Sequence, residues 1–244
     1  MYLKNVHKEV LPYIYTTITR QDMKRTKLCD RPLPTYTRPE ELLNSISHAI
    51  GAVFGVIVLI LCVVKASSVD AWSVVGAAIY GASMIVLYSA SCIYHAVKPG
   101  ITKQVMRIID HSTINLLIAG TYTPILLCAI RPVSETWAWI IFAVVWGFGI
   151  IAASLTSIDL KNYSKFAMVC YIGMGWSIFL AGDTVLKALP IEAFIYLLLG
   201  GVAYTVGAVI YGLGKKHRYF HFIFHLFALL GSVLQFVCVY FYVI

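Results

Sequence analysis

Charged residues are scarce in this chain of 244 residues: Asp, Glu, Lys and Arg make up 12%, whereas 60% of the residues are hydrophobic. Soluble domains usually contain about 25% charged and about 45–50% apolar residues. With half the usual charge, the chain could not cover a globular surface of this size with polar groups. The composition therefore argues against a soluble enzyme, a disordered chain and a secreted disulfide-bonded scaffold, and it indicates a polytopic membrane protein.

Acidic residues are especially few, with 11 Asp and Glu against 19 Lys and Arg, so the net charge is +8. Such an excess can indicate nucleic-acid binding, but the basic segment contains no recognisable nucleic-acid-binding motif. Eight of the basic residues fall within the first 38 positions, and the others lie between hydrophobic runs or at their ends. We therefore expect membrane topology to explain the charge, and we expect no nucleic-acid partner.

Cysteine pairs and an apolar leader are also missing. The six cysteines form no C-x-x-C pair, and five of them lie inside apolar runs. This pattern predicts small packing residues rather than disulfides or a thiolate zinc site. The first 38 residues contain no long apolar stretch, so we expect no cleavable signal peptide.

Seven long apolar runs dominate the rest of the sequence. Each has about 20–25 residues, enough to cross a bilayer core of about 30 Å as a helix. The runs cover residues 44–65, 72–96, 108–130, 137–157, 166–187, 191–213 and 219–243. We therefore predict an all-α fold with seven transmembrane helices, in a multi-pass protein of the cell membrane. Residues 1–40 are predicted to form a basic cytoplasmic arm, and residues 41–244 the seven-helix domain.

The distribution of basic residues predicts the orientation of these helices. With the amino terminus in the cytoplasm, 16 Lys and Arg lie on the inner side and three on the outer side. Because loops rich in Lys and Arg stay in the cytoplasm, we expect the amino terminus inside and the carboxyl terminus outside. Within the arm, residues 10–18 are either a short amphipathic stretch on the membrane surface or part of a solvated, partly disordered segment.

A few ionisable residues lie within or at the ends of the apolar runs, where each costs at least a few kcal/mol. They include His48, His95, Asp110, His111, Asp183, His221 and His225. Asp183 lies near the outer end of the fifth run, and we interpret it as a structural acid. The other six lie in the inner half of the bilayer under the predicted topology. These six residues, although far apart in sequence, are therefore candidates for one cluster.

His221 and His225 are four residues apart, so on a helix both imidazoles project from one face. That spacing allows two ring nitrogens to bind one metal ion, and His95 could supply a third from another helix. Three histidines leave one tetrahedral position open, as in catalytic zinc sites, and imidazoles without a thiolate pair suit zinc. Asp110 could accept a proton or orient a histidine, and Ser91 could supply a hydroxyl. The alternative is that these histidines are hydrogen-bonded packing residues.

These residues carry a resemblance to a known family. From about residue 37 to its end, the sequence resembles hemolysin III proteins, within the progestin and adipoQ receptor group and the wider CREST superfamily. The matching motifs are Asn44-Ser45-Ile46-Ser47-His48, Ser91-x-x-x-His95, Asp110-His111 and His221-x-x-x-His225. The resemblance implies a seven-helix fold with zinc near the cytoplasmic face. The implied zinc ligands are His95, His221 and His225, and the implied polar partners are Asp110 and Ser91.

The same resemblance implies hydrolysis of a lipid amide bond, because the relatives include receptors with ceramidase-like activity and the alkaline ceramidases. Zinc would polarise the carbonyl and lower the pKa of its bound water, while Asp110 acts as the base. The chain departs from the family pattern in two places. Gln235 stands where we expect many hemolysin III proteins to carry histidine, and the first 36 residues have no counterpart that we recognise.

Three functions are compatible with these observations. The first is a zinc-dependent hydrolase that acts on an amide or ester bond of a membrane lipid or lipid-like substrate. The second is a sensor or signalling module in which zinc is structural. The third is a pore-forming or cytolytic protein, as the family name suggests, although ionisable residues confined to the inner half argue against a constitutive channel. The sequence makes no prediction of the individual substrate or of the oligomeric state.

Overall fold

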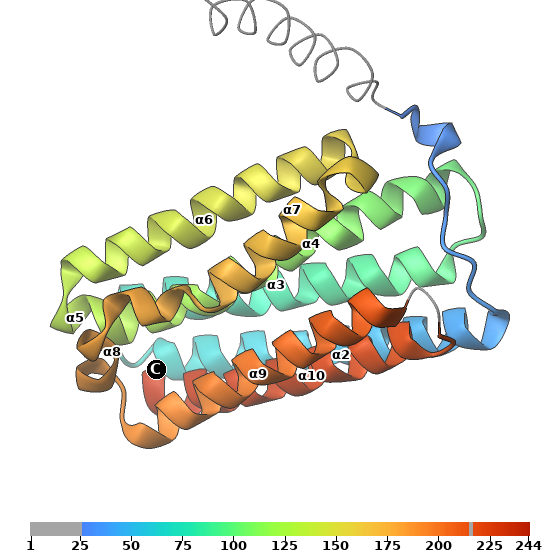
Figure 1. Cartoon of the computed structure of the whole chain (residues 1–244). Helices are drawn as coiled ribbons and strands as arrows, with labels where there is room; N and C mark the ends of the chain where they lie inside the picture. Colours follow the sequence, from blue (N-terminus) through green and yellow to red (C-terminus); the bar gives the residue numbers. More distant parts are fainter. Residues whose placement is uncertain (1–25, 215–216) are drawn as a thin grey trace, which may run out of the picture.

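The computed structural model describes residues 26–214 and 217–244, which form a bundle of helices with no β-strand among them (Figure 1). The stretch considered at 10–18 lies outside the described residues. In chain order the elements are η1 (Leu28–Asp30), α2 (Arg38–Ala66), α3 (Ala71–Ala96), α4 (Ile101–Pro124), η2 (Ile125–Ile130), α5 (Arg131–Val133), α6 (Glu135–Ile158), α7 (Leu160–Gly175), η3 (Ser177–Ala181), α8 (Asp183–Ala188), α9 (Ile191–Leu213), α10 (Phe220–Cys238) and η5 (Val239–Val243). The predicted all-α class is confirmed.

Among the described residues, six helical segments are long and apolar enough to cross a membrane. They are Arg38–Ala66, Ala71–Ala96, Ile101–Val133, Glu135–Ile158, Ile191–Leu213 and Phe220–Val243. The predicted span 166–187 is not one of them, because it is divided between α7, η3 and α8. Gly182 separates η3 from α8 with a φ of 55°, a backbone conformation that glycine adopts readily. Six of the seven predicted spans therefore correspond to helices of membrane-spanning length.

Local capping sequences explain where the helices begin. The carboxylate of Glu40 accepts hydrogen bonds from the backbone nitrogen and the hydroxyl of Thr37, at 2.9 and 2.7 Å. Together with Pro39 in the first turn, this contact favours a helix start directly after Thr37. Residues 38–40, which the sequence assigned to the arm, consequently form the first turn of α2. Capping residues, rather than the limits of the apolar run, determine this boundary.

Glycines allow α2 and α3 to approach closely. A Cβ atom at Gly81 of α3 would lie 2.5 Å from the Cα atom of Leu59 on α2. A Cβ atom at Gly51 of α2 would lie 2.5 Å from the ring of Tyr88 on α3. Small residues at such positions are typical of helix contacts in membranes, where close backbone packing replaces the hydrophobic effect.

The outer surface of the bundle is covered by large apolar side chains. Val53 on α2, Ile150 on α6 and Val169 on α7 are each more than half exposed. Monomeric soluble proteins rarely expose contiguous apolar patches larger than a few hundred Å². A surface of this kind instead suits contact with the hydrocarbon of a bilayer.

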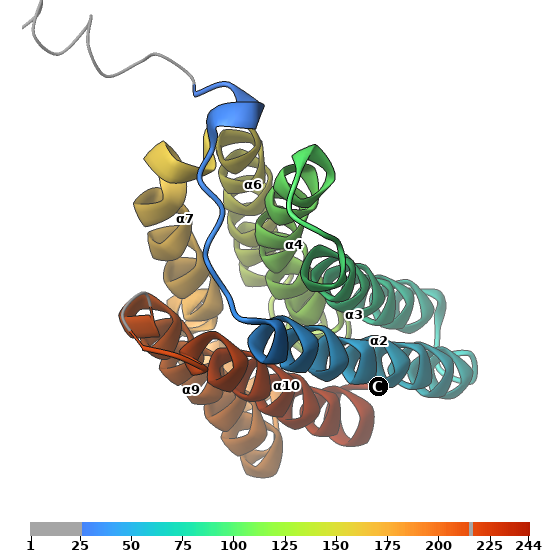
Figure 2. The ribbon, with the colours of Figure 1, turned by 90° about the vertical axis from the view of Figure 1, so that its right-hand side faces the viewer.

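Residues 26–37, which we call the strap, cross one end of the bundle before α2 begins (Figure 2). The backbone nitrogen of Thr26 donates to the Asp159 carboxylate at 3.2 Å. The guanidinium of Arg31 donates to the carbonyl oxygen of Ile158 at 2.6 Å. These contacts fasten the strap to the turn between α6 and α7. At the same end of the bundle α2 and α10 begin and α3 ends (Figure 1).

Candidate metal centre

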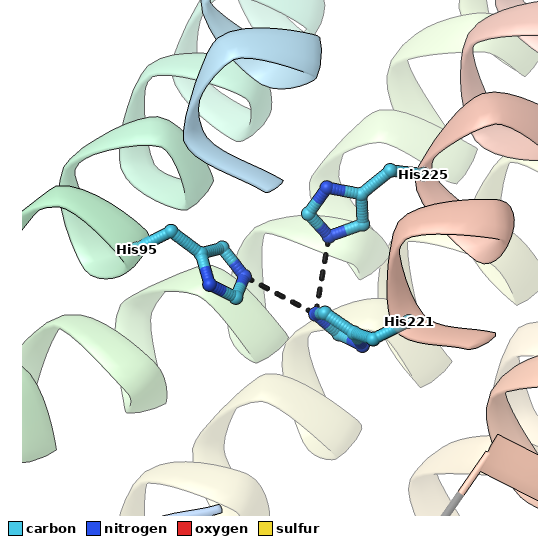
Figure 3. A group of neighbouring side chains, drawn as sticks. All are labelled: His95, His221 and His225. Atoms are coloured by element: carbon cyan, nitrogen blue, oxygen red, sulfur yellow. Dashed lines mark hydrogen bonds between the residues drawn. The ribbon is translucent and has the colours of Figure 1, made fainter. Parts of the chain in front are cut away.

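Three histidines from two helices lie close together at the end of the bundle that the strap crosses. We call them the histidine cluster. His95 lies in the last turn of α3, and His221 and His225 lie at the start of α10. Figure 3 shows the three rings pointing toward one another. All three side chains are buried, and one possible ligand atom from each lies within 4.8 Å of the other two. The predicted meeting of these residues is confirmed.

The start of α10 is tied to the start of α2. Tyr219, directly before α10, has a left-handed backbone with a φ of 63°. Its backbone nitrogen donates to the carboxylate of Glu40 at 2.9 Å. Glu40 therefore contacts the residues directly before both helices, and this contact helps to position His221 beside α2 and α3.

The Nε2 atoms of the cluster face its centre. The Nε2 atom of His221 lies 3.1 Å from Nε2 of His95 and 3.1 Å from Nε2 of His225. On the opposite sides of two rings, Nδ1 of His95 is 2.6 Å from the Glu41 carboxylate, and Nδ1 of His225 is 3.3 Å from the Asn44 carbonyl oxygen. Because these oxygens only accept, a proton on each Nδ1 satisfies both contacts, and this tautomer leaves the lone pair of Nε2 directed at the centre.

This arrangement fits a metal ion. A proton on Nε2 of His221 can point at only one of the two neighbouring rings, so a hydrogen bond cannot satisfy both contacts. Nitrogen ligands about 2.0–2.1 Å from a tetrahedral metal are about 3.3–3.4 Å apart. The observed 3.1 Å separations are close to that value. The histidine cluster could therefore hold a metal ion of the kind that imidazole binds.

Glu41 lies behind His95 as a second layer of the site. Its carboxylate contacts Nδ1 of His95 through one oxygen and Nζ of Lys103 through the other, at 2.6 and 2.8 Å. Lys103 is 2% exposed and also donates to the carbonyl oxygens of Tyr94 and Val97. These contacts orient the carboxylate, which in turn orients the imidazole. A carboxylate on the outer nitrogen is common for histidines that bind metal.

Sequence reasoning did not identify Glu41 or Lys103 as part of the site. One signal was present, because Glu41, Asn44 and His48 have the i, i+3, i+7 spacing of a single helix face. That face of α2 contacts the histidine cluster through Glu41 and the Asn44 backbone. Lys103 gave no such signal, because it lies in the polar first turn of α4, outside the predicted apolar runs.

Tyr36 of the strap lies against the cluster from the end of the bundle. Its ring centroid is 5.1 Å from that of His221, in a stacked arrangement, and 5.8 Å from that of His95. Burial raises the pKa of the Tyr36 hydroxyl above its ordinary value, so the hydroxyl is neutral at physiological pH. The strap therefore covers the histidine cluster with an aromatic ring, which no sequence motif indicated.

The two predicted polar partners lie on the wall of a cavity that two of the histidines also line. Asp110 of α4 is 8% exposed, with its carboxylate 3.4 Å from Nδ1 of His111. Ser91 of α3 is 1% exposed, and its hydroxyl has no hydrogen-bond partner among the described residues. Among those residues, no hydrogen bond joins Asp110 or Ser91 to the histidine cluster. The structure thus brings Asp110 and Ser91 to the cavity that His221 and His225 also line.

The cavity extends from the histidine cluster into the bundle, and apolar and aromatic side chains form most of its wall. They include Leu87, Ile118, Trp176, Phe179, Phe194 and Leu198. Gln235 also lines it, about 15 Å from His225 along α10 at about 1.5 Å per residue. The Gln235 amide donates to the carbonyl oxygen of Leu197 on α9 at 3.1 Å, and this residue is not part of the histidine cluster. A long, mostly apolar cavity suits an apolar chain.

Two other ionisable residues from the sequence analysis lie outside the cluster. His111 points its Nε2 at the Tyr211 hydroxyl, 3.2 Å away. Asp183 is exposed at the start of α8 and pairs with Lys187. The interpretation of Asp183 as a structural acid agrees with this contact.

Comparison with known proteins agrees with the resemblance described above. The family described as "Haemolysin-III related" matches residues 36–236. The chain is 39% identical over 206 residues to Hemolysin-3 from Bacillus cereus, covering 84% of this chain and 92% of that protein. It is 35% identical over 208 residues to the Hemolysin-3 homolog from Bacillus subtilis (strain 168), covering 85% of this chain and 96% of that protein. This chain, with its apolar helices, therefore belongs to the haemolysin III family of multi-pass membrane proteins.

Proposed function

We propose that the protein is a zinc-dependent hydrolase within the membrane, acting on an amide or ester bond of a lipid. One observation carries the proposal: three convergent imidazole nitrogens lie at one end of a mostly apolar cavity. Catalytic metal sites combine a ligand set that leaves a position open with a shaped cavity that excludes water. Here the apolar part of the cavity would bind the hydrocarbon chain of the lipid, and the amide or ester bond would lie at the metal end.

His95, His221 and His225 would hold the zinc ion. Three neutral imidazoles leave at least one of four tetrahedral positions free, as catalytic zinc requires. The Glu41 carboxylate and the Asn44 carbonyl oxygen support this assignment, because they direct the Nδ1 protons away from the centre. Imidazole ligands without a thiolate suit zinc among the common metals.

The chain's own polar groups have distinct parts in the proposed reaction. When bound, zinc would polarise the lipid carbonyl and make water more acidic. Asp110 would accept the proton of the attacking water and later return it to the departing amine or alcohol. The Ser91 hydroxyl, which has no partner among the described residues, would donate a hydrogen bond to the carbonyl oxygen of the lipid. His111 beside Asp110 would keep that carboxylate oriented.

We further propose seven membrane passes, with the strap in the cytoplasm and the carboxyl terminus outside. The segment from α7 through η3 to α8 runs along the bundle between the ends of α6 and α9, which supports its role as the fifth pass (Figure 1). Lys98, Arg107, Lys161 and Arg218 lie in or beside the loops at the strap end, which favours a cytoplasmic location. Residues 1–40 would then be a cytoplasmic arm, followed by a domain of residues 41–244.

Cytolysis is a second candidate, because the two relatives are named hemolysins. A pore needs polar groups along a complete path through the bilayer. Among the described residues, the aspartate and histidine side chains of the cavity wall gather at its metal end, and the rest of the wall is mostly apolar. This distribution favours the hydrolase.

The test is fatty-acid release from ceramide and from a monoacylglycerol by the purified protein in nanodiscs. We expect turnover by the wild type, and a loss of at least about 100-fold in Asp110→Ala and His225→Ala. Asp183→Ala and His217→Ala change exposed residues of the same types, so they should keep wild-type turnover. Equal turnover in all five proteins would contradict the catalytic assignment. Absence of turnover by the wild type, together with leakage of liposomes, would favour cytolysis.

A further inference from the structure

His48 of α2 lines the cavity but has no part in the proposed reaction. Its side chain is 3% exposed, and neither ring nitrogen has a hydrogen-bond partner among the described residues. An unpaired N–H group that is removed from water destabilises a protein, so buried polar groups nearly always have a partner. For a group on a cavity wall, a bound ligand can be that partner.

Packing holds the His48 ring in one orientation. It stacks face to face on His225, with centroids 3.6 Å apart and planes 10° apart. The ring of Tyr88 packs edge-on at 5.0 Å. His48 stacks on the ring of His225, and it is not one of the three residues whose ligand atoms converge. The ring is thus fixed next to the histidine cluster, and both of its nitrogens lack partners.

Two more polar groups on the cavity wall lack partners at the same end. They are the Ser91 hydroxyl on α3 and Nδ1 of His221 on α10. Beyond them the wall is mostly apolar. The cavity therefore offers polar contacts from three helices at one end and an apolar channel behind them, the pattern that an amphipathic ligand needs.

The charged side chains at the metal end of the cavity indicate which class of lipid headgroup it can bind. The described residues that line the cavity include the acid Asp110 but no Lys or Arg. Apart from the proposed zinc ion, whose open position is assigned to the reacting carbonyl and water, no cation of the lining would compensate a phosphate headgroup beside Asp110, whereas an amide or a hydroxyl carries no charge. An uncharged polar headgroup is therefore favoured.

We propose that His48 is a substrate-binding residue, whose neutral ring donates a hydrogen bond to an uncharged oxygen of the lipid headgroup. This inference rests on the proposed lipid substrate and adds the residue that recognises its polar end. It requires no titration of His48 and no contact between His48 and the metal. The competing explanation is that His48 only packs against His225.

Two substitutions separate these explanations. His48→Phe keeps an aromatic ring for stacking on His225 and removes both nitrogens. His48→Gln restores a hydrogen-bond donor without an aromatic ring. His217→Phe makes the same change as His48→Phe at an exposed position and serves as the control.

Each variant is measured for zinc content, thermal stability and KM for the hydrolysed lipid. Binding of radiolabelled dodecanamide and dodecane is measured in the Asp110→Ala background, so that the readout does not depend on turnover. For His48→Phe we expect unchanged zinc, no loss of stability, and an increase of about tenfold in KM and in the Kd of dodecanamide. The Kd of dodecane should not change, and His48→Gln should recover part of the dodecanamide affinity.

Two results would overturn the inference. Wild-type KM and dodecanamide affinity in His48→Phe would make His48 a packing residue. Loss of zinc in His48→Phe would mean that the ring acts through His225. If the wild type hydrolyses no lipid, the proposed function fails, but the comparison of dodecanamide with dodecane still decides the role of His48.

Discussion

Glu41 connects the histidine cluster to two other parts of the molecule. Its carboxylate lies between the His95 ring and the buried Lys103 side chain. The Lys103 charge is satisfied by this carboxylate and by two backbone carbonyl oxygens at the end of α3. A single acid on α2 thereby orients a histidine on α3 and anchors the first turn of α4.

Glu41→Gln should weaken metal binding about 10- to 100-fold, because glutamine keeps the shape of the side chain but loses the charge that fixes the His95 ring. Titration with a competing chelator measures this affinity. Glu192→Gln provides the matched control, since Glu192 also lies in the first turn of its helix but is exposed. Equal metal affinity in Glu41→Gln and the wild type would rule out this role of Glu41.

The site residues differ in how far the sequence could predict them. His221 and His225 were predictable from their spacing, and His95 from its depth in the predicted topology. Glu41 and Tyr36 act through contacts between segments that approach only in the folded chain. Their contribution depends on the packing of α2 against α3 and on the path of the strap, neither of which a local pattern describes.

Among the helix contacts, the close packing of α2 against α3 depends on small side chains. Gly81 meets the backbone of α2 at Leu59, which cannot move aside as a flexible side chain could. Gly147 of α6 has open space around its Cα atom. The two glycines therefore provide a matched pair for testing helix contact.

Gly81→Ala should lower the free energy of unfolding by about 1–3 kcal/mol, because the added methyl group forces α2 and α3 apart. Gly147→Ala should raise it by about 0.5–1 kcal/mol, because alanine favours a helix interior. Reversible unfolding in mixed detergent micelles measures both values. A neutral effect of Gly81→Ala would show that the two helices pack less closely than described.

Hydropathy predicted the helices well where a run lacks backbone breaks, as in 137–157 and 191–213. The run 166–187 was predicted as one helix, since glycine inside an apolar run gives no clear sign of its backbone angles. In the structure, Gly182 takes a positive φ and the helix is divided. Hydropathy thus identified an apolar segment of spanning length but not its shape.

Considered as a whole, the molecule has polar contacts concentrated at the strap end. The histidine cluster, Glu41, Lys103 and the strap all lie there, and the opposite end of the cavity is mostly apolar. The basic residues near this end favour a cytoplasmic location for it. The topology proposed above follows from that asymmetry.

Cys29 in the strap is exposed and should react with a membrane-impermeant maleimide only from the cytoplasmic side. Ser68→Cys, made in a Cys29→Ser background, introduces a thiol into the exposed turn between α2 and α3 and should react only from outside. Labelling of right-side-out and inside-out vesicles measures both reactions. The opposite pattern of labelling would reverse the proposed orientation.

The metal content of the purified protein tests the central claim most directly. By elemental mass spectrometry we expect about one zinc ion per chain in the wild type. His95→Ala should lose most of it, and His217→Ala, which changes an exposed histidine outside the cluster, should retain it. A wild-type protein without zinc, or a His95→Ala variant with undiminished zinc, would contradict the three-histidine site.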